Sequence, residues 1–164
     1  SMRQNDGGWI IPLNMFKQTF YYEMARKDPI PPDKSLPSSH MTTGMVLRAF
    51  SAHPDYRKKE EVLWAAELLA SRLFKADAFT FRQAPSYWFK LQYPYWWTNL
   101  LSAMDSLAAF RFKPQDPRIR AGLEWFRNNQ NPSGTWNSSY DGKDPDANGW
   151  ITFAVCRMMK AFLG

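Results

Sequence analysis

The residues best suited to chemistry in this chain are aromatic, and many of them lie in one segment. Nine of the 19 residues from Phe79 to Trp97 are aromatic, and two prolines break any helical spacing there. Apolar pockets with few polar groups are the usual sites for small ligands. We therefore predict a ligand-facing surface in this segment, formed by Tyr87, Trp88, Tyr93, Trp96 and Trp97. Plain packing of these rings between helices is the alternative.

Acidic and cysteine residues are weaker candidates for chemistry. Residues 144–149 read Asp-Pro-Asp-Ala-Asn-Gly, which matches the first half of a calcium-binding EF-hand loop. The twelfth position of such a loop would be Val155 rather than glutamate, so the bidentate ligand is missing and we predict no metal site. Cys156 is the single cysteine and is predicted to be a core residue.

Composition indicates one globular domain. Of the 164 residues, 45% are apolar and 16% aromatic, which is enough for a sizeable core. The net charge of +6 is spread out, and the densest basic cluster, 57–59, is followed by two glutamates, which favours a solvated helix face over a nucleic-acid site. The single cysteine favours a cytoplasmic location, and no apolar stretch has the length of a membrane span. No cofactor is expected.

Helical spacing of apolar residues predicts an all-α fold. It recurs in six segments, 12–26, 40–52, 58–74, 98–110, 117–129 and 150–162, which would pair into three hairpins. Ser38 or Ser39 is a plausible cap of the second segment, and Asp116 with Pro117 begins the fifth. Residues 134–148 are expected to form a polar turn region, with Asn148-Gly149 at the entry to the last helix.

Two turns share one pattern of glutamine, two or three residues, glycine, one residue and tryptophan. The two copies consist of Gln4, Gly7 and Trp9, and of Gln130, Gly134 and Trp136. A glutamine amide can cap the open end of a helix, glycine permits a tight turn, and tryptophan can wedge the turn against the next helix. A degenerate third copy runs from Gln83 to Trp88, with serine in the glycine position.

A second repeat is independent of the turns. Thr43, Thr98 and Thr152 each open an apolar helical run, and they lie 55 and 54 residues apart. Repeats at a nearly fixed period are typical of repeat architectures.

The second turn extends upstream to Arg120-Ala121, with Phe126 four residues before Gln130. This stretch, 120–136, resembles the QW motif of the terpenoid cyclase and protein prenyltransferase superfamily. The match is shorter at 4–9 and covers most of the chain as architecture only. It implies an α/α toroid, here a partial ring of about three hairpins in one domain over residues 1–164. The helix that should precede Gln4 is missing, so the chain is predicted to be the C-terminal part of a longer protein.

The catalytic motifs of that superfamily are absent from the chain. Squalene-type cyclases protonate an alkene with an aspartate in a DxDD or DCTAE-like motif, and neither occurs here. Prenyltransferase β subunits hold zinc through Asp, Cys and a later His. Here Ala154 stands where that aspartate should precede Cys156, and His40 and His53 both lie far upstream. Catalytic residues are therefore left unassigned, and enzymatic activity stays open.

The resemblance also implies a place for the ligand. In the resembled enzymes, aromatic side chains line a central cavity, hold polyisoprene chains and stabilise carbocations. His40 and Asp105 belong to helices that a toroid would place innermost, so both are expected beside the aromatic segment. We expect an apolar or isoprenoid-like small molecule as ligand. The exposed flank is expected to be covered by a homodimer partner or by a missing part of the chain.

Three alternatives remain for the function. The chain could be a fragment of an enzyme whose catalytic residues lie in a missing half, or a protein-interaction module. It could also be a carbohydrate-binding toroid, although the paired carboxylates of carbohydrate-active enzymes have no good candidate here.

Overall fold

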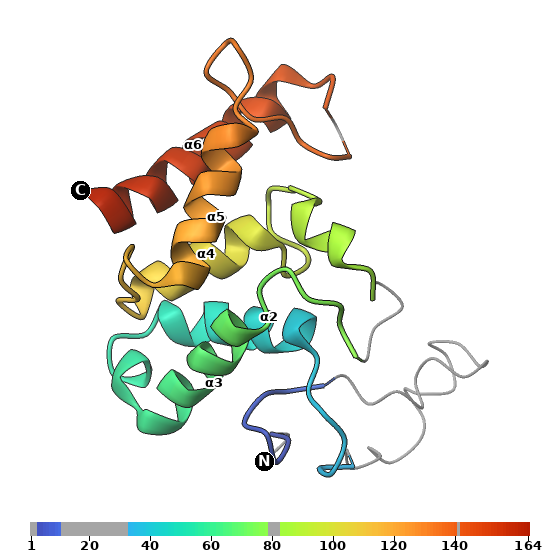
Figure 1. Ribbon diagram of the computed structural model, residues 1–164, viewed down its shortest axis with the longest axis vertical. Helices are drawn as coiled ribbons and strands as arrows, with labels where there is room; N and C mark the ends of the chain where they lie inside the picture. Colours follow the sequence, from blue (N-terminus) through green and yellow to red (C-terminus); the bar gives the residue numbers. More distant parts are fainter. Residues whose placement is uncertain (1–2, 11–32, 79–82, 141) are drawn as a thin grey trace, which may run out of the picture.

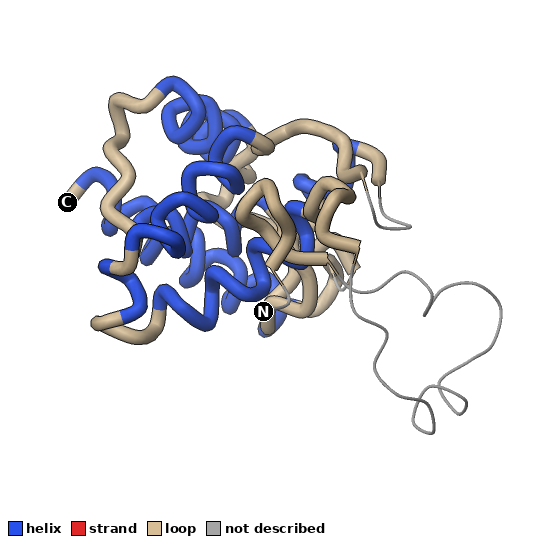
Figure 2. The backbone as a smooth tube through the Cα atoms, turned by 90° about the horizontal axis from the view of Figure 1, so that it is seen from below, coloured by secondary structure: helices blue, strands red, loops and turns tan. Residues whose placement is uncertain are grey.

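The computed structural model describes residues 3–10, 33–78, 83–140 and 142–164. Within these ranges it contains helices and loops but no extended strand, so the predicted all-α class is confirmed for them (Figures 1 and 2). The α-helices are α2 (His40–Ser51), α3 (Glu60–Ser71), α4 (Leu100–Ala109), α5 (Pro117–Asn128) and α6 (Pro145–Leu163). Two short 3-10 helices are η2 (Tyr56–Lys58) and η3 (Pro85–Phe89). The helix predicted at 12–26 lies outside the described residues.

The five α-helices of the described ranges form two rows. α4 contacts both α2 and α6, so these three helices follow one another in a first row. α3 packs against α2 and α4, and α5 packs against α3 and α4, so α3 and α5 form a second row (Figure 1). Because α4 contacts the other four helices, it is the central element of the fold.

The core gathers around α4. Only Asp105, Ala108 and Ala109 of its ten residues are partly exposed, and their spacing of three and four places them on one face of the helix. Its other faces are buried against apolar residues of the neighbouring helices, among them Leu47, Ile119, Phe126, Ile151 and Val155. The face that carries Asp105 is thus the one that other helices leave uncovered.

Side-chain caps determine where two of the helices begin, as the sequence predicts. The Ser39 hydroxyl accepts a hydrogen bond from the backbone of Thr42 at the start of α2. Asp116 accepts one at the start of α5, with Pro117 in the first turn.

Two other helix starts differ from the prediction. α4 begins at Leu100, two residues later than the predicted start at Thr98, and its cap is Asn99, which forms a reciprocal capping box with Ser102. α6 begins at Pro145 with Asp144 as its cap, so the entry predicted at 148–149 is wrong. The acidic stretch that resembles half of an EF-hand therefore serves as the first turn of a helix, where the N-cap position favours Asp.

The glycines of the two Gln-Gly-Trp turns have the backbone that the pattern predicts. Gly7 has φ of 93° and Gly134 has φ of 81°, in the left-handed region that disfavours residues with a Cβ. The role predicted for glutamine is wrong. The Gln4 amide donates to loop carbonyls of Asp33 and Leu36, and the Gln130 amide donates to the carbonyl of Gly134 within its own turn.

Each turn is joined to a following helix through a threonine hydroxyl. The backbone N–H of Trp9 donates to Thr43 Oγ1 at 3.0 Å, and that of Trp136 donates to Thr152 Oγ1 at 3.1 Å. The Gln-Gly-Trp turn repeat and the threonine repeat therefore belong to the same structural joint. In each of its two copies, a turn tryptophan is hydrogen-bonded to a helix threonine. Thr98 differs, because its hydroxyl donates to a backbone carbonyl of α2.

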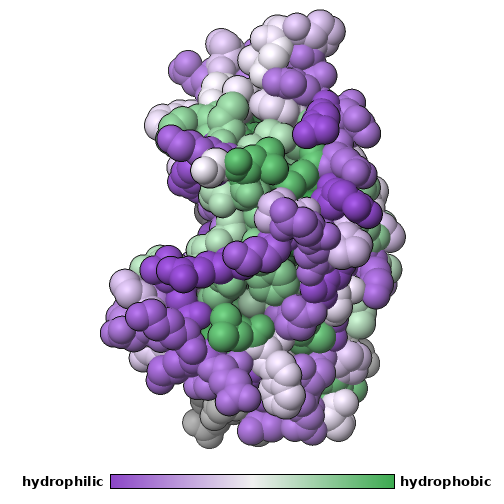
Figure 3. Space-filling model, turned by 60° about the vertical axis from the view of Figure 1, so that its left-hand side comes forward, coloured by the Kyte–Doolittle hydropathy of each residue, from purple (hydrophilic) through white to green (hydrophobic). Residues whose placement is uncertain are grey.

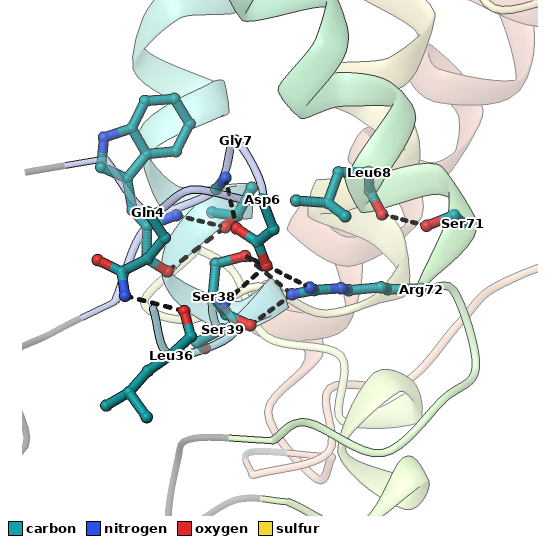
Figure 4. Close-up of polar contacts among 12 residues, drawn as sticks. Gln4, Asp6, Gly7, Leu36, Ser38, Ser39, Leu68, Ser71 and Arg72 are labelled. Atoms are coloured by element: carbon teal, nitrogen blue, oxygen red, sulfur yellow. Dashed lines mark hydrogen bonds and ion pairs between the residues drawn. The ribbon is translucent and has the colours of Figure 1, made fainter. Parts of the chain in front are cut away.

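The first joint is also tied to the second row of helices. Asp6, in the turn, accepts hydrogen bonds from the backbone of Ser38 and from the Arg72 guanidinium, both at 2.8 Å (Figure 4). Arg72 is the residue at the end of α3, and it also donates to the carbonyl and hydroxyl of Ser38. The N-terminal turn, the start of α2 and the end of α3 are thus held at one point.

Candidate functional site

The structure divides the predicted site residues among different environments. His40 and Trp88 are buried in contact with each other, and Tyr87 and Trp97 line a small pocket. Trp96 is 67% exposed. Only Tyr93 and Asp105 belong to a surface where several aromatic and charged side chains come together.

The first environment is a buried pair of rings. His40 stacks on Trp88 with ring centroids 4.3 Å apart and planes 25° apart. The Trp88 indole donates to the carbonyl of Lys75 at 2.8 Å, which holds the ring beneath the loop that follows α3. For these two residues, the alternative of plain packing is the one that the structure favours.

A serine, a histidine and an aspartate meet beside this pair, but they do not form a catalytic triad. Asp77 Oδ2 accepts hydrogen bonds from the Ser39 hydroxyl at 2.6 Å and from the backbone of Met41 at 3.1 Å. The same oxygen lies 3.8 Å from His40 Nε2. A catalytic serine must be hydrogen-bonded to its histidine base, whereas this hydroxyl is bonded to the carboxylate. The cluster therefore orders the start of α2.

The electrostatics of His40 agree with a structural role. The pKa of His40 is lowered to about 4, mainly by burial. Asp77 acts in the opposite direction, and the nearby Arg72 adds to the lowering. The imidazole is thus neutral at neutral pH. Sequence reasoning singled out His40 but not Asp77, which sits in a loop and has no motif around it.

The second environment is a pocket too small for a polyisoprene chain. It has room for about one water molecule. Its lining residues are Met41, Tyr87, Lys90, Gln92, Trp97, Thr98, Asn99 and Tyr140.

The third environment is a surface built by all three helices of the first row. Asp105 of α4 accepts a 2.6 Å hydrogen bond from the Arg157 guanidinium of α6. The Arg48 guanidinium of α2 lies over the ring of Tyr95, 5.5 Å from its centroid. Tyr95 comes from the loop that precedes α4, and within the described residues its buried hydroxyl has no hydrogen-bond partner.

Aromatic rings extend this surface along α6. Tyr93 stacks on Trp150 with centroids 5.6 Å apart and planes 14° apart, and it meets the edge of Tyr95 at 5.3 Å. Trp150 in turn meets Phe153 at 6.3 Å, with the two planes perpendicular. Trp150 is 55% and Phe153 56% exposed, so both offer apolar area to solvent. We call the whole set the first-row surface: Arg48, Tyr93, Tyr95, Asp105, Trp150, Phe153 and Arg157.

The first-row surface carries two guanidinium groups and one carboxylate. Burial raises the pKa of Tyr95, and so does the Asp105 carboxylate, so the phenol stays protonated and remains a donor. Burial lowers the pKa of Arg48, because a partly desolvated guanidinium loses hydration of its charge. The surface thus combines exposed aromatic area with a net positive charge.

Sequence reasoning missed most of this surface. Residues of α2 and α6 such as Arg48 and Arg157 read as ordinary solvated helix positions. The sequence did contain a pattern that relates the two arginines to each other. Arg48 follows Thr43 by five residues, and Arg157 follows Thr152 by five. The repeated threonine joint places both arginines at equivalent positions of their helices.

The position of the cysteine shows that the prediction of a core residue was wrong. Cys156 is exposed rather than part of the core, because the buried face of α6 is formed by neighbours such as Val155 and Met158. In the described part of the chain, no three or more histidine, cysteine, aspartate or glutamate side chains gather as a possible metal site. None of the described helices is both long and apolar enough to cross a membrane.

Comparisons with known proteins returned no relative: no family model, no curated protein and no solved structure matches this chain.

Proposed function

We propose that this chain is a partial α/α toroid of the terpenoid cyclase and prenyltransferase type, and that it binds an apolar, isoprenoid-like molecule on the first-row surface. The observation that carries the proposal is the continuous set of rings from Tyr95 through Tyr93 to Trp150 and Phe153. Two of these rings are more than half exposed although they are held in place by their neighbours.

The arrangement of helices supports the proposal that the chain is a partial toroid. A toroid of this type consists of an inner and an outer layer of helices, and α2, α4 and α6 would correspond to the inner layer. The joint between tryptophan and threonine, present twice, is the kind of repeated contact expected in such an architecture. Figure 3 shows one side of the molecule hollowed between an upper and a lower part, with apolar residues bordering the hollow.

The composition of the first-row surface supports the proposal that it binds an apolar molecule. Aromatic rings bury large areas at a low cost in side-chain entropy, so exposed and prearranged rings favour binding of an apolar partner. Stacking on Tyr93 fixes the plane of Trp150 before a ligand arrives, which reduces the ordering that binding requires.

A calorimetric titration with farnesol tests this function. The unchanged protein should bind, and Trp150→Ala should weaken binding by about tenfold, because about 1.4 kcal/mol or more of apolar contact is lost. The matched control is Trp64→Ala. Trp64 is 74% exposed on α3 in the second row, so its loss should leave the affinity unchanged.

Three results would count against the proposal. Farnesol and the longer geranylgeraniol could both fail to bind up to their solubility limits. The two tryptophan variants could weaken binding equally, which would place the ligand elsewhere or nowhere in particular. Binding of maltotriose in place of both alcohols would favour the carbohydrate alternative.

A further inference from the structure

We infer that the ligand of the first-row surface carries a single carboxylate at one end of its apolar chain, and that Arg48 binds this carboxylate. The inference rests on the proposed function, because it concerns the polar end of the molecule whose apolar part the rings would hold. It names the chemical class of that molecule: a monocarboxylic acid with an isoprenoid-like tail.

One of the two guanidinium groups of the first-row surface is paired with a carboxylate. Arg157 is neutralised by Asp105, since their guanidinium and carboxylate are 2.6 Å apart. Among the described residues, the Arg48 guanidinium has no hydrogen-bond acceptor and no carboxylate within ion-pair distance. It lies over the Tyr95 ring, and the Asp105 carboxylate attracts its charge without forming an ion pair with it. A guanidinium presents donors in a fork that matches a carboxylate, so Arg48 is the group in this surface with unused binding capacity.

The net charge of the first-row surface restricts the charge of its ligand. Two guanidinium groups and one carboxylate leave one positive charge on the surface. A ligand with one negative charge neutralises it, whereas a diphosphate brings several negative charges and a cation is repelled. The surface is therefore unsuited to holding a carbocation, despite its aromatic rings.

The charged and aromatic groups follow a fixed order along the first-row surface. Arg48 lies over Tyr95 at 5.5 Å, Tyr95 meets Tyr93 at 5.3 Å, and Tyr93 stacks on Trp150 at 5.6 Å. Arg48, the guanidinium without an ion-pair partner, is thus at the α2 end, and the exposed rings are at the α6 end. A molecule with a polar head and an apolar tail can satisfy both ends in one orientation only.

The Tyr95 hydroxyl supports the assignment of a ligand carboxylate beside Arg48. It is a donor buried without a partner, and such a group costs free energy unless an acceptor is supplied. Burial keeps the phenol protonated by raising its pKa. A carboxylate oxygen beside Arg48 is an acceptor of the required kind.

Calorimetric titration with farnesoic acid and with farnesol, which share one chain and differ in the head group, tests the inference. At pH 7 and moderate salt, the protein should bind the acid about tenfold or more tightly than the alcohol. Arg48→Gln should abolish this preference by weakening the binding of the acid about tenfold or more, whereas farnesol should still bind, which also shows that the variant is folded. Arg127→Gln is the control, since Arg127 is exposed on α5 in the second row and should preserve the preference.

The outcomes separate the two proposals. If neither compound binds, the proposed function itself fails. If both bind equally, the aromatic surface binds apolar chains but the inference of a carboxylate is wrong. A preference for the acid that survives Arg48→Gln would contradict the role of Arg48. Tighter binding of farnesyl diphosphate than of farnesoic acid would contradict the single negative charge.

Discussion

At the scale of single residues, His40 shows how a side chain with catalytic potential can serve packing instead. Its ring is stacked on Trp88, it is 5% exposed, and its nearest carboxylate is engaged by a serine hydroxyl and a backbone amide. The residue type alone could not distinguish this role from chemistry, because the distinction depends on Asp77, which lies 37 residues away in the sequence.

This burial leads to a prediction about pH. The pKa of His40 is about 4 in the folded protein, against an ordinary value of 6.5 in an unfolded chain. Between these values the unfolded state binds a proton that the folded state does not, so stability rises with pH through this window and falls as the pH is lowered. The loss from pH 6.5 to 4 should reach up to about 3 kcal/mol. Urea denaturation across this range measures it.

Two variants control for this effect. His40→Phe preserves a ring beside Trp88 and should remove most of the slope between pH 6.5 and 5, whereas His53→Phe alters an exposed ring and should retain it. Carboxylates such as Asp6, whose pKa in the folded protein lies below its ordinary value of 3.8, affect stability mainly below pH 5 and add little to the slope between pH 6.5 and 5. An unchanged slope in His40→Phe would show that another group titrates.

Trp136 offers a second prediction at this scale. Its ring is 4% exposed, and its indole donates to the carbonyl of Phe126 near the end of α5 at 2.9 Å. Trp136→Ala should lower the free energy of unfolding by about 3 kcal/mol or more, because a large cavity is left and a hydrogen bond is lost. Trp64→Ala should change it by less than about 0.5 kcal/mol. Equal effects of the two variants in urea denaturation would mean that the turn is not packed as described.

At the scale of elements, the sequence predicted the existence of the helices better than their ends. The 3.6-residue spacing of buried side chains indicated α2 to α5 within a few residues, because burial on one face is what produces that spacing. α6 begins five residues earlier than predicted, since its first turn is polar and exposed and leaves no apolar signal. The predicted glutamine caps failed because both amides find carbonyls in loops instead of at helix ends.

The joint between turn and helix gives a prediction for elements. Thr152 Oγ1 accepts from the backbone of Trp136 and donates to the carbonyl of Asn148 at 2.8 Å. Thr152→Val keeps the shape but leaves that N–H without its acceptor, so the free energy of unfolding should fall by about 1–2 kcal/mol. Thr152→Ser keeps the hydroxyl and should be affected much less. If serine proves as destabilising as valine in thermal and urea denaturation, the hydroxyl is not what joins the two elements.

The close approach of α2 to the start of α4 gives another prediction for elements. A Cβ on Gly44 would lie 2.4 Å from side-chain atoms of Thr98, whereas a Cβ on Gly149, within α6, would meet nothing within 4 Å. Gly44→Ala should therefore destabilise the fold by about 1–3 kcal/mol. Gly149→Ala should be neutral or stabilise it by up to about 1 kcal/mol, since alanine is the better helix former. A Gly44→Ala protein as stable as the unchanged one would show that the two helices are further apart.

At the scale of the whole molecule, two rows of helices bring residues far apart in the sequence into one surface. Arg48, Asp105 and Arg157 come from three helices, so their meeting depends on the packing of α2, α4 and α6 and on nothing local. The aromatic segment was predictable from composition, but only Tyr93 of the five chosen rings joins the surface. Trp88 is buried, Tyr87 and Trp97 line the small pocket, and Trp96 is exposed, because an irregular segment gives no periodic signal of which way a ring points.

The central claim is that an apolar ligand binds on the first-row surface, and NMR of the indole N–H groups tests it most directly. The chain has eight tryptophans, and each gives its own resonance once assigned by single substitutions. On titration with farnesol, the resonance of Trp150 should shift strongly, while those of Trp64 on the second row and of the buried Trp136 should stay in place. Saturable shifts at Trp64 with none at Trp150, or no shift at any tryptophan, would contradict the account.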